Sequence, residues 1–271
     1  MGADLSQRLV PDELWELVAP LLPSFAARPQ GGGAAPCDER AVFTAVVYVL
    51  TSGCVWRHLP PTFGTSSATA HRRFTAWTEA GLWRRLHRAV LDELGARGEV
   101  DWTSAITDAA SVRTKRGTAD RAEPGRSRQE GQRTARPVRR SGHPPTVAVS
   151  GANLHDSQTF KPLILAVPDI RSRRGPGRRR PVKIRADKAY FSADHLAWLR
   201  DRGLIPRIAR PGIESGERLG RHRWKIERSI SWLFGYCRLT VRYERKGSHF
   251  LAFLGLAAAL TCYKKLAKLT T

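Results

Sequence analysis

Three acidic residues stand where a folded chain could bring their carboxylates together. Asp108 closes the β-like run AIT, Asp187 closes the run IRA, and Glu227 lies in a stretch whose apolar residues have helical spacing. Three carboxylates can hold two divalent cations about 3.5–4 Å apart, which stabilise the attacking and leaving oxygens of a phosphoryl transfer. Mg²⁺ takes only one or two protein carboxylates and keeps much of its water. The pattern therefore predicts two Mg²⁺ (or Mn²⁺) ions at these residues.

Each acid taken alone has a plainer interpretation. An aspartate at the end of a strand is usually a turn or cap residue. Glu227 lies one helical turn after Arg223, so the two could form an ordinary surface ion pair of little energetic value. The order Asp-Asp-Glu, with two acids after strands and the third on a helix, is more specific than any one of them.

The charge balance indicates the class of partner. The chain has 46 Lys plus Arg against 24 Asp plus Glu, a net charge of +22 and a pI of about 11.1. Lysine and arginine that neutralise phosphates release counterions, so a nucleic acid is the favoured partner. Charge alone does not separate DNA from RNA or from an acidic membrane surface.

Composition excludes several other classes. The four cysteines are scattered, without zinc or disulfide spacing, which favours a reducing cytoplasm. The N-terminus lacks a secretion pattern. The longest apolar stretch, residues 250–263, is shorter than a membrane span and predicts a buried helix.

Hydrophobic periodicity predicts an α/β fold. The first third of the chain has helical patterns, at residues 11–22, 38–53, 66–79 and 82–94. From about residue 100, β-like runs (103–112, 145–153, 182–191 and 204–210) alternate with helical ones (157–167, 192–203, 220–236 and 248–269).

Five segments resemble insertion-sequence transposases of the Asp-Asp-Glu class, and the resemblance as a whole extends over nearly the entire chain. They are the strand around Asp108, LTSGCVWRHLPPTFGTSSATAHRRFTAW, VAVSGANLHDS, ADKAYF and, most specific, RHRWKIERSISWLFGYCRLTVRYER. The resemblance implies an RNase H-like mixed sheet flanked by helices in residues 99–271. It also implies an all-helical, helix-turn-helix-like DNA-binding domain in residues 1–98.

The resemblance carries roles over to particular positions. It makes Asp108, Asp187 and Glu227 metal ligands and Arg223 a catalytic phosphate contact. Arg221 and Lys188 are expected beside the DNA backbone. A related signature has a tyrosine before the arginine and a lysine beyond the glutamate, and this chain departs from it with Gly220 and Phe234.

The helix predicted at residues 66–79 is a candidate recognition helix. We expect His71, Arg72 and Arg73 to face DNA, and Phe74 and Trp77 to face the core. The alternative is an ordinary helical bundle with a basic face.

The function implied by the resemblance is metal-dependent cleavage of insertion-element ends, followed by transfer of the freed 3′-hydroxyl to target DNA. The implied partners are double-stranded DNA (terminal inverted repeats and target) and further copies of the chain, in a dimer or larger synaptic complex in the cytoplasm, associated with the nucleoid. The alternatives are a nuclease of the same fold and a catalytically dead DNA-binding remnant.

Two segments depart from the expected pattern. Residues 119–145 are rich in Arg, Gly and Pro and lack strand-like alternation, so they are expected to be disordered or poorly packed. Such a composition fits a compensated pair of frameshifts in a GC-rich gene, or a natural disordered insertion. Residues 171–181 include six arginines and predict a solvated loop, which could grip phosphates or serve as a linker.

Overall fold

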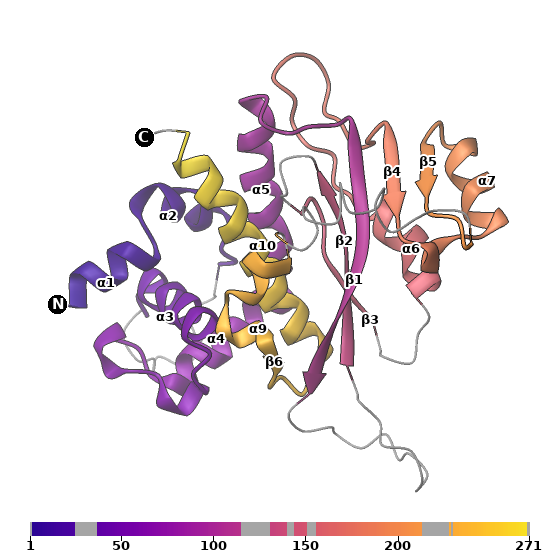
Figure 1. The fold of residues 1–271 in the computed structure, drawn as a ribbon. Helices are drawn as coiled ribbons and strands as arrows, with labels where there is room; N and C mark the ends of the chain where they lie inside the picture. Colours follow the sequence, from indigo (N-terminus) through magenta and orange to yellow (C-terminus); the bar gives the residue numbers. More distant parts are fainter. Residues whose placement is uncertain are drawn as a thin grey trace, which may run out of the picture.

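The protein combines a body of helices with a mixed β-sheet, which confirms the predicted α/β class (Figure 1). The structure is a computed structural model that describes residues 2–24, 37–114, 131–139, 144–150, 156–212, 228 and 230–269. The N-terminal helices and the C-terminal helix form one side of the molecule, and the sheet with its outer helices forms the other.

The N-terminal body contains the predicted helices and one more. Its elements are α1 (Gly2–Leu9), α2 (Asp12–Val18), η1 (Ala19–Leu21), α3 (Glu39–Ser52), η2 (Trp56–His58), η3 (Pro61–Phe63), α4 (Ser67–Glu79) and α5 (Leu82–Ala96). The Asp38 carboxylate caps α3 by accepting hydrogen bonds from two backbone N–H groups, and Gly53 ends α3 with a φ of 72°. Ser66 caps α4 in the same way as Asp38 caps α3.

The sheet has the strand order β3-β2-β1-β4-β5, with β6 paired to β1. The strands are β1 (Ser104–Thr114), β2 (Gly131–Arg139), β3 (Ala148–Ser150), β4 (Lys183–Ala186), β5 (Ile205–Ile208) and β6 (Val241–Arg242). The pairs β1–β2 and β2–β3 are antiparallel, whereas β4, β5 and β6 run in the direction of β1. The remaining elements are α6 (Asp156–Leu165), η4 (Lys188–Tyr190), α7 (Ala193–Asp201), α9 (Cys237–Thr240) and α10 (Gly247–Ala267).

Part of the segment at 119–145, which the composition predicts to be disordered or poorly packed, forms a strand. β2 lies inside this segment and pairs antiparallel with β1 from Ala105↔Arg139 to Arg113↔Gly131. Backbone hydrogen bonds between strands do not require alternating side chains, so the pattern missed the strand. Pro137 lies beyond the stretch of β2 that pairs with β3, and a proline is tolerated where a strand lacks a second neighbour. The composition of the segment is therefore compatible with a paired strand, and the frameshift interpretation stays a hypothesis. Residues 119–130 and 140–143 lie outside the described residues.

Two hydrophobic cores hold the molecule together. The larger one joins α2, α3, α4 and α5 to α10 and includes Val112 of β1. The smaller one lies between the sheet and the helices α6 and α7, where Phe160, Ile184 and Leu199 are buried. The larger core therefore crosses the predicted boundary between residues 98 and 99, which stays a prediction.

α10 is the buried helix that its apolar sequence predicts. By length and composition alone it could cross a membrane, but 78% of its most apolar stretch is buried inside the protein. It packs mainly against α5 and also contacts α4, α9 and β3, and Phe253 of α10 stacks on Phe74 with ring centroids 4.5 Å apart.

The arginine-rich segment at 171–181 is exposed but not poorly packed. Ile170 and Arg178 exchange backbone hydrogen bonds of 2.9 and 2.8 Å, so the chain between them folds back as a hairpin. Figure 1 shows this hairpin above the sheet, beside the C-terminal end of α5. The four cysteines are free, in agreement with the sequence.

Candidate active site

Asp108 and Asp187 occupy matching backbone positions on neighbouring strands. The last paired residues of the parallel strands β1 and β4 are Thr107 and Ala186. Asp108 and Asp187 are the next residue in each case. Because hydrogen-bonded strands lie about 4.8 Å apart, the backbone brings the two aspartates to one place in the sheet, although 79 positions separate them in the sequence (187 − 108 = 79).

This place is also the switch point of the sheet. From β1 the chain continues to β2 on one side, and it reaches β4 on the other side only after β3 and α6. Pairing of β1 with β4 stops at Thr107, and pairing with β6 begins at Arg113. Among the described strands, the stretch between them is paired only on its β2 side. Ligands of α/β sheets bind where the strand order reverses in this way.

Asp187 is fixed by the elements on both sides of it. It follows β4 directly, and its Oδ1 accepts a 2.7 Å hydrogen bond from the Lys188 N–H, which caps η4. At the other end of η4, Tyr190 is buried, and its carbonyl oxygen lies 2.8 Å from Nδ1 of the buried His195. Asp187 is exposed. Lys188 is exposed beside it.

The third predicted acid cannot be compared with this geometry. Glu227, Arg223 and Arg221 lie outside the described residues. The helical segment that follows them is anchored in the larger core, where Leu233 and Tyr236 are buried. Burial raises the pKa of the Tyr236 hydroxyl to about 12.

A buried ion pair that the sequence analysis missed lies after this segment. The Arg238 Nε donates to Glu244 Oε1 at 2.7 Å, with side-chain exposures of 4% and 3%. Arg238 also donates to the Cys54 carbonyl oxygen at 2.7 Å, and its guanidinium lies over the Phe253 ring. The pair therefore ties α9 to the end of α3 and to α10. Both residues belong to the run YCRLTVRYER, where the resemblance signalled a motif without indicating its role.

The candidate recognition helix α4 has a buried face and an exposed face, as predicted. Phe74 and Trp77 are fully buried, which confirms their expected direction. Arg72 is exposed. Arg73, by contrast, is engaged with Glu39 of α3 at 3.1 Å, with 21% of its side chain exposed. Of the two arginines, Arg72 is thus the one placed to meet a ligand.

His71 belongs to an aromatic cluster between α4, η2 and α10. Its ring lies 5.3 Å from Trp56 and 5.8 Å from His249, both in edge-to-face geometry. Partial burial lowers the pKa of both histidines, and the positive charge of Lys246 lowers both further. Arg238 acts on the pKa of His71 in the same direction, whereas Glu244 and Glu79 oppose it at His249. Both imidazoles are therefore biased toward the neutral form.

The donor chemistry of the aspartate pair fits a hard cation. Two carboxylates at adjacent backbone positions offer oxygen ligands, which Mg²⁺ and Mn²⁺ prefer. Among the described residues, no group of three or more His, Cys, Asp or Glu gathers elsewhere as a rival metal site. Glu227, the expected third ligand, is outside that part of the chain.

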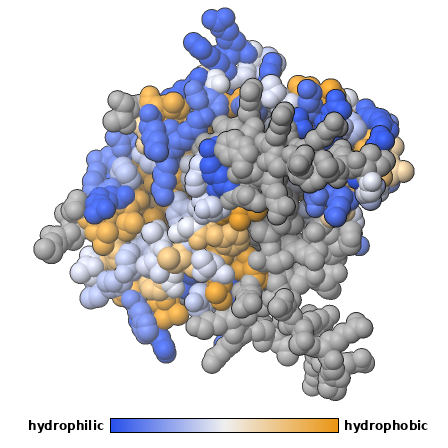
Figure 2. Space-filling model, in the orientation of Figure 1, coloured by the Kyte–Doolittle hydropathy of each residue, from blue (hydrophilic) through white to orange (hydrophobic). Residues whose placement is uncertain are grey.

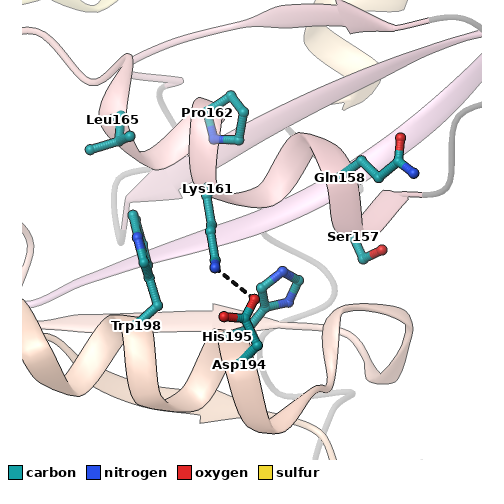
Figure 3. A pocket seen from close by; sticks show the side chains of 8 residues that line it. All are labelled: Ser157, Gln158, Lys161, Pro162, Leu165, Asp194, His195 and Trp198. Atoms are coloured by element: carbon teal, nitrogen blue, oxygen red, sulfur yellow. Dashed lines mark ion pairs between the residues drawn. The ribbon is translucent and has the colours of Figure 1, made fainter.

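A separate groove of about 510 Å³ lies between α6 and α7 (Figure 3). Lys161 reaches across it to Asp194, with Nζ and Oδ2 2.6 Å apart, and lies over the Trp198 ring. The ion pair lowers the pKa of the Asp194 carboxyl. Because this carboxylate and this amine satisfy one another, the groove presents no acid and base aimed at a common substrate atom.

The comparison with protein families decides the assignment. Residues 103–262 match the family described as "Transposase DDE domain", and residues 10–87 match "Putative transposase of IS4/5 family". The chain belongs to the DDE transposase family. The match spans both Asp108 and Asp187 and more than half of the chain.

Two curated relatives from Burkholderia cepacia support the assignment to this transposase family. One is "Putative transposase for insertion sequence element IS402", 41% identical over 126 residues, which are 46% of this chain and 60% of the relative. The other is "Insertion element IS402 uncharacterized 16.2 kDa protein", 38% identical over 111 residues, which are 40% of this chain and 76% of the relative. The match thus spans somewhat less than two thirds of the first relative.

Among solved structures, complexes of the Mos1 transposase are distant neighbours of this DDE transposase. The crystal structure of the Mos1 strand transfer complex aligns with a TM-score of 0.32 and 10% identity, over 90% of this chain and 81% of the Mos1 chain. The Mos1 paired-end complex aligns with a TM-score of 0.26 and 9% identity, over 80% of each chain. A likeness this low carries no argument about fold or function.

Proposed function

We propose that this protein is an insertion-sequence transposase that cuts the ends of its element and joins them to target DNA. The observation that supports this most is the equal register of Asp108 and Asp187 on two parallel strands of a DDE-family chain. A nuclease of the same fold would share that site. The family match and the IS402 relatives favour transposition over a nuclease or a dead remnant.

The fold of the catalytic part is proposed to be RNase H-like, in residues 99–271. The support is the strand order β3-β2-β1-β4-β5, with three antiparallel strands followed by two strands parallel to β1. β2 is the strand that this proposal requires next to β1, and it is present. The N-terminal helices, residues 1–98, are proposed to bind DNA.

The metal ligands are proposed to be Asp108, Asp187 and Glu227, which would hold two Mg²⁺ or Mn²⁺ ions. Divalent cations at such a site supply charge neutralisation at the scissile phosphate and lower the pKa of the attacking water. The chain's own part is to fix the carboxylates in place. For Asp187 this is the cap of η4 and the buried Tyr190.

The DNA contacts are proposed to come from three places. On α4, Arg72 meets DNA directly and His71 lies beside it, while Arg73 orients the helix through Glu39. Near the acids, Lys188, Arg221 and Arg223 would hold the phosphates around the cleaved bond. Two element ends must be brought together, so a dimer or larger synaptic complex in the bacterial cytoplasm, on the nucleoid, is part of the proposal.

The test is a strand-cleavage assay on a plasmid that carries the gene's own flanking DNA. Wild-type protein is expected to nick at the element ends with Mg²⁺ and to be inactive with a chelator. Asp187→Ala should bind the ends and leave them intact. Binding of the ends without any cleavage by wild-type protein would instead identify a dead remnant.

A further inference from the structure

The arginine hairpin, which we define as residues 170–180, concentrates positive charge on a described part of the surface. It carries six arginines in the run RSRRGPGRRR, and every residue from 173 to 180 is exposed. Figure 2 shows the hydrophilic side chains gathered over it at the top of the molecule. The proposed active site does not use this hairpin.

The hairpin is held firmly on α5. The backbone N–H of Arg171 donates to Asp92 Oδ1 at 2.8 Å. The chain passes so close to Gly95 that a Cβ there would lie 2.0 Å from the Arg171 carbonyl oxygen. Below it, Ile170 is fully buried in the larger core. The hairpin is therefore a fixed part of the surface and loses little freedom when it binds.

The tip of the hairpin is stabilised from within. The Ser172 hydroxyl lies 2.8–3.0 Å from the carbonyl oxygens of Arg174, Gly175 and Pro176, so it can donate to any of them. Gly175 has a φ of 83°, a left-handed conformation that favours glycine. The sequence RSRRGPG therefore builds a turn that presents arginines instead of a loose linker.

Within the hairpin the arginines divide into two kinds. Arg179 points inward and donates to the carbonyl oxygens of Val167 and Leu165, at 3.1 and 2.6 Å. The other five arginines are exposed, and their guanidinium groups form no ion pair or hydrogen bond with the described part of the chain: Arg171, Arg173, Arg174, Arg178 and Arg180. The nearby acids, Asp92 and Asp169, face the backbone at Arg171 and Gly177 instead.

The hairpin and the candidate active site lie at opposite ends of β4. It leads into the start of β4, whereas Asp187 follows the end of β4. Four residues of strand span about 13 Å. A phosphate held by the hairpin is therefore not the phosphate between Asp108 and Asp187.

We propose that the arginine hairpin binds the phosphate backbone of target DNA, independently of its sequence. Arginines on a rigid turn match phosphates in charge and geometry, but a turn has no helix or strand ribbon to enter a groove and read bases. A surface that neutralises phosphates alone suits DNA whose sequence is not fixed, which is the target and not the element end. This inference rests on the proposed transposase function.

The experiment compares two charge-matched variants of the full chain. One removes four of the five unpaired guanidinium groups (Arg173→Gln, Arg174→Gln, Arg178→Gln, Arg180→Gln) and keeps Arg171, whose backbone holds the hairpin to Asp92. The other removes four exposed charges elsewhere (Arg8→Gln, Arg84→Gln, Arg200→Gln, Lys268→Gln). Affinity for an unrelated 30-base-pair duplex is measured between 50 and 200 mM salt by fluorescence anisotropy.

We expect the hairpin variant to flatten the slope of log affinity against log salt by about 0.9 for each phosphate that the protein no longer neutralises. The control variant should flatten it by less than half as much. The hairpin variant should still cleave element ends at the wild-type rate while joining them to target DNA at least 10-fold more slowly. Equal slopes for the two variants, or an absence of end cleavage by the hairpin variant, would overturn the inference.

Failure of the inference and failure of the proposed function give different results. If wild-type protein neither binds nor cuts DNA, the proposed function fails. If wild-type protein cuts and joins while both variants behave alike, only the role of the hairpin fails. Arg179→Gln should lower the melting temperature without changing the salt slope, which separates the structural arginine from the four that we assign to DNA.

Discussion

At the scale of single residues, the proposed site depends on two aspartates whose backbone positions the sheet brings together. Neither Asp108 nor Asp187 is informative alone, since each could be a turn residue. Each follows the last paired residue of β1 and β4, which supports the shared function that we propose for them, and Asp187 gains a fixed orientation from the Lys188 N–H. Residues that ligate one metal cluster act as a unit, so their individual effects should not multiply.

Substitution of these aspartates tests that coupling. Asp108→Asn and Asp187→Asn should each reduce end cleavage by more than about 100-fold, because even outer-sphere changes at metal sites cost 10–100-fold. The double variant should be no worse than about 10-fold below either single one. Cleavage rates in Mg²⁺ measure this, with Asp194→Asn as a control because Asp194 is exposed and pairs with Lys161 instead. A double variant whose loss equals the product of the two single losses would contradict a shared site.

The buried pair of Arg238 and Glu244 leads to a stability prediction. Breaking such a pair leaves one charge buried and unpaired, so Arg238→Met should destabilise the protein by about 3–5 kcal/mol. The double variant Arg238→Met, Glu244→Leu should be more stable than Arg238→Met alone, since no charge remains. Urea unfolding of the two variants gives both values. A double variant less stable than Arg238→Met would show that the hydrogen bonds, and not the lone charge, decide the cost.

At the scale of elements, β2 is the strand that pairs with β1 along nearly its whole length on one side. Ala135 of β2 pairs with Ala109 of β1 and with Ala148 of β3, so its backbone lies between two strands. Ala135→Pro removes a backbone donor from the middle of the sheet and should destabilise the protein by about 3 kcal/mol. Pro137→Ala, outside the stretch paired with β3, should change the stability by less than about 1 kcal/mol. Thermal unfolding of both variants measures this, and equal melting temperatures would mean that β2 is not part of the folded sheet.

Elements with strong local signals could be predicted, and the others depended on partners far away in the sequence. The caps at Asp38 and Ser66 and the apolar spacing around Phe74 are local, so α3 and α4 were predicted nearly to the residue. β2 has no alternating pattern and exists through pairing with β1, which no local feature encodes. The resemblance predicted a common role for Asp108 and Asp187. The strand register that brings their backbones together follows from the sheet topology, which the sequence did not reveal. Arg238 also donates a hydrogen bond to the Cys54 carbonyl oxygen, 184 positions away, a contact that local sequence does not encode.

At the scale of the whole molecule, His71 of α4 and His249 of α10 lie in contact, and protonation of these histidines destabilises the folded state. Burial lowers the pKa of His71 and His249 in the folded state, while in the unfolded chain histidine titrates near 6.5. The unfolded chain therefore binds more protons below about pH 6.5, and the free energy of unfolding falls as pH falls through this range. This contribution is fully present above the unfolded pKa.

We expect wild-type protein to lose stability between pH 7.5 and pH 5.5 more steeply than the variant His71→Gln, His249→Gln. Urea unfolding across this range gives the free energy of unfolding of each protein. Subtracting one pH profile from the other cancels the contribution of the titrating groups that the two proteins share. Identical pH profiles for the two proteins would mean that the histidines have the same proton affinity in the folded and unfolded states.

The most direct test of the transposase function is strand transfer with a pre-cut element end. A labelled duplex that ends in the element's own terminal 3′-hydroxyl is incubated with the full chain, Mg²⁺ and a supercoiled target plasmid. The predicted result is a covalently joined product that requires Mg²⁺ and is absent with Asp187→Asn. If wild-type protein binds the labelled end and nicks DNA but never joins the end to the plasmid, the chain is a nuclease and the proposed transposition is wrong.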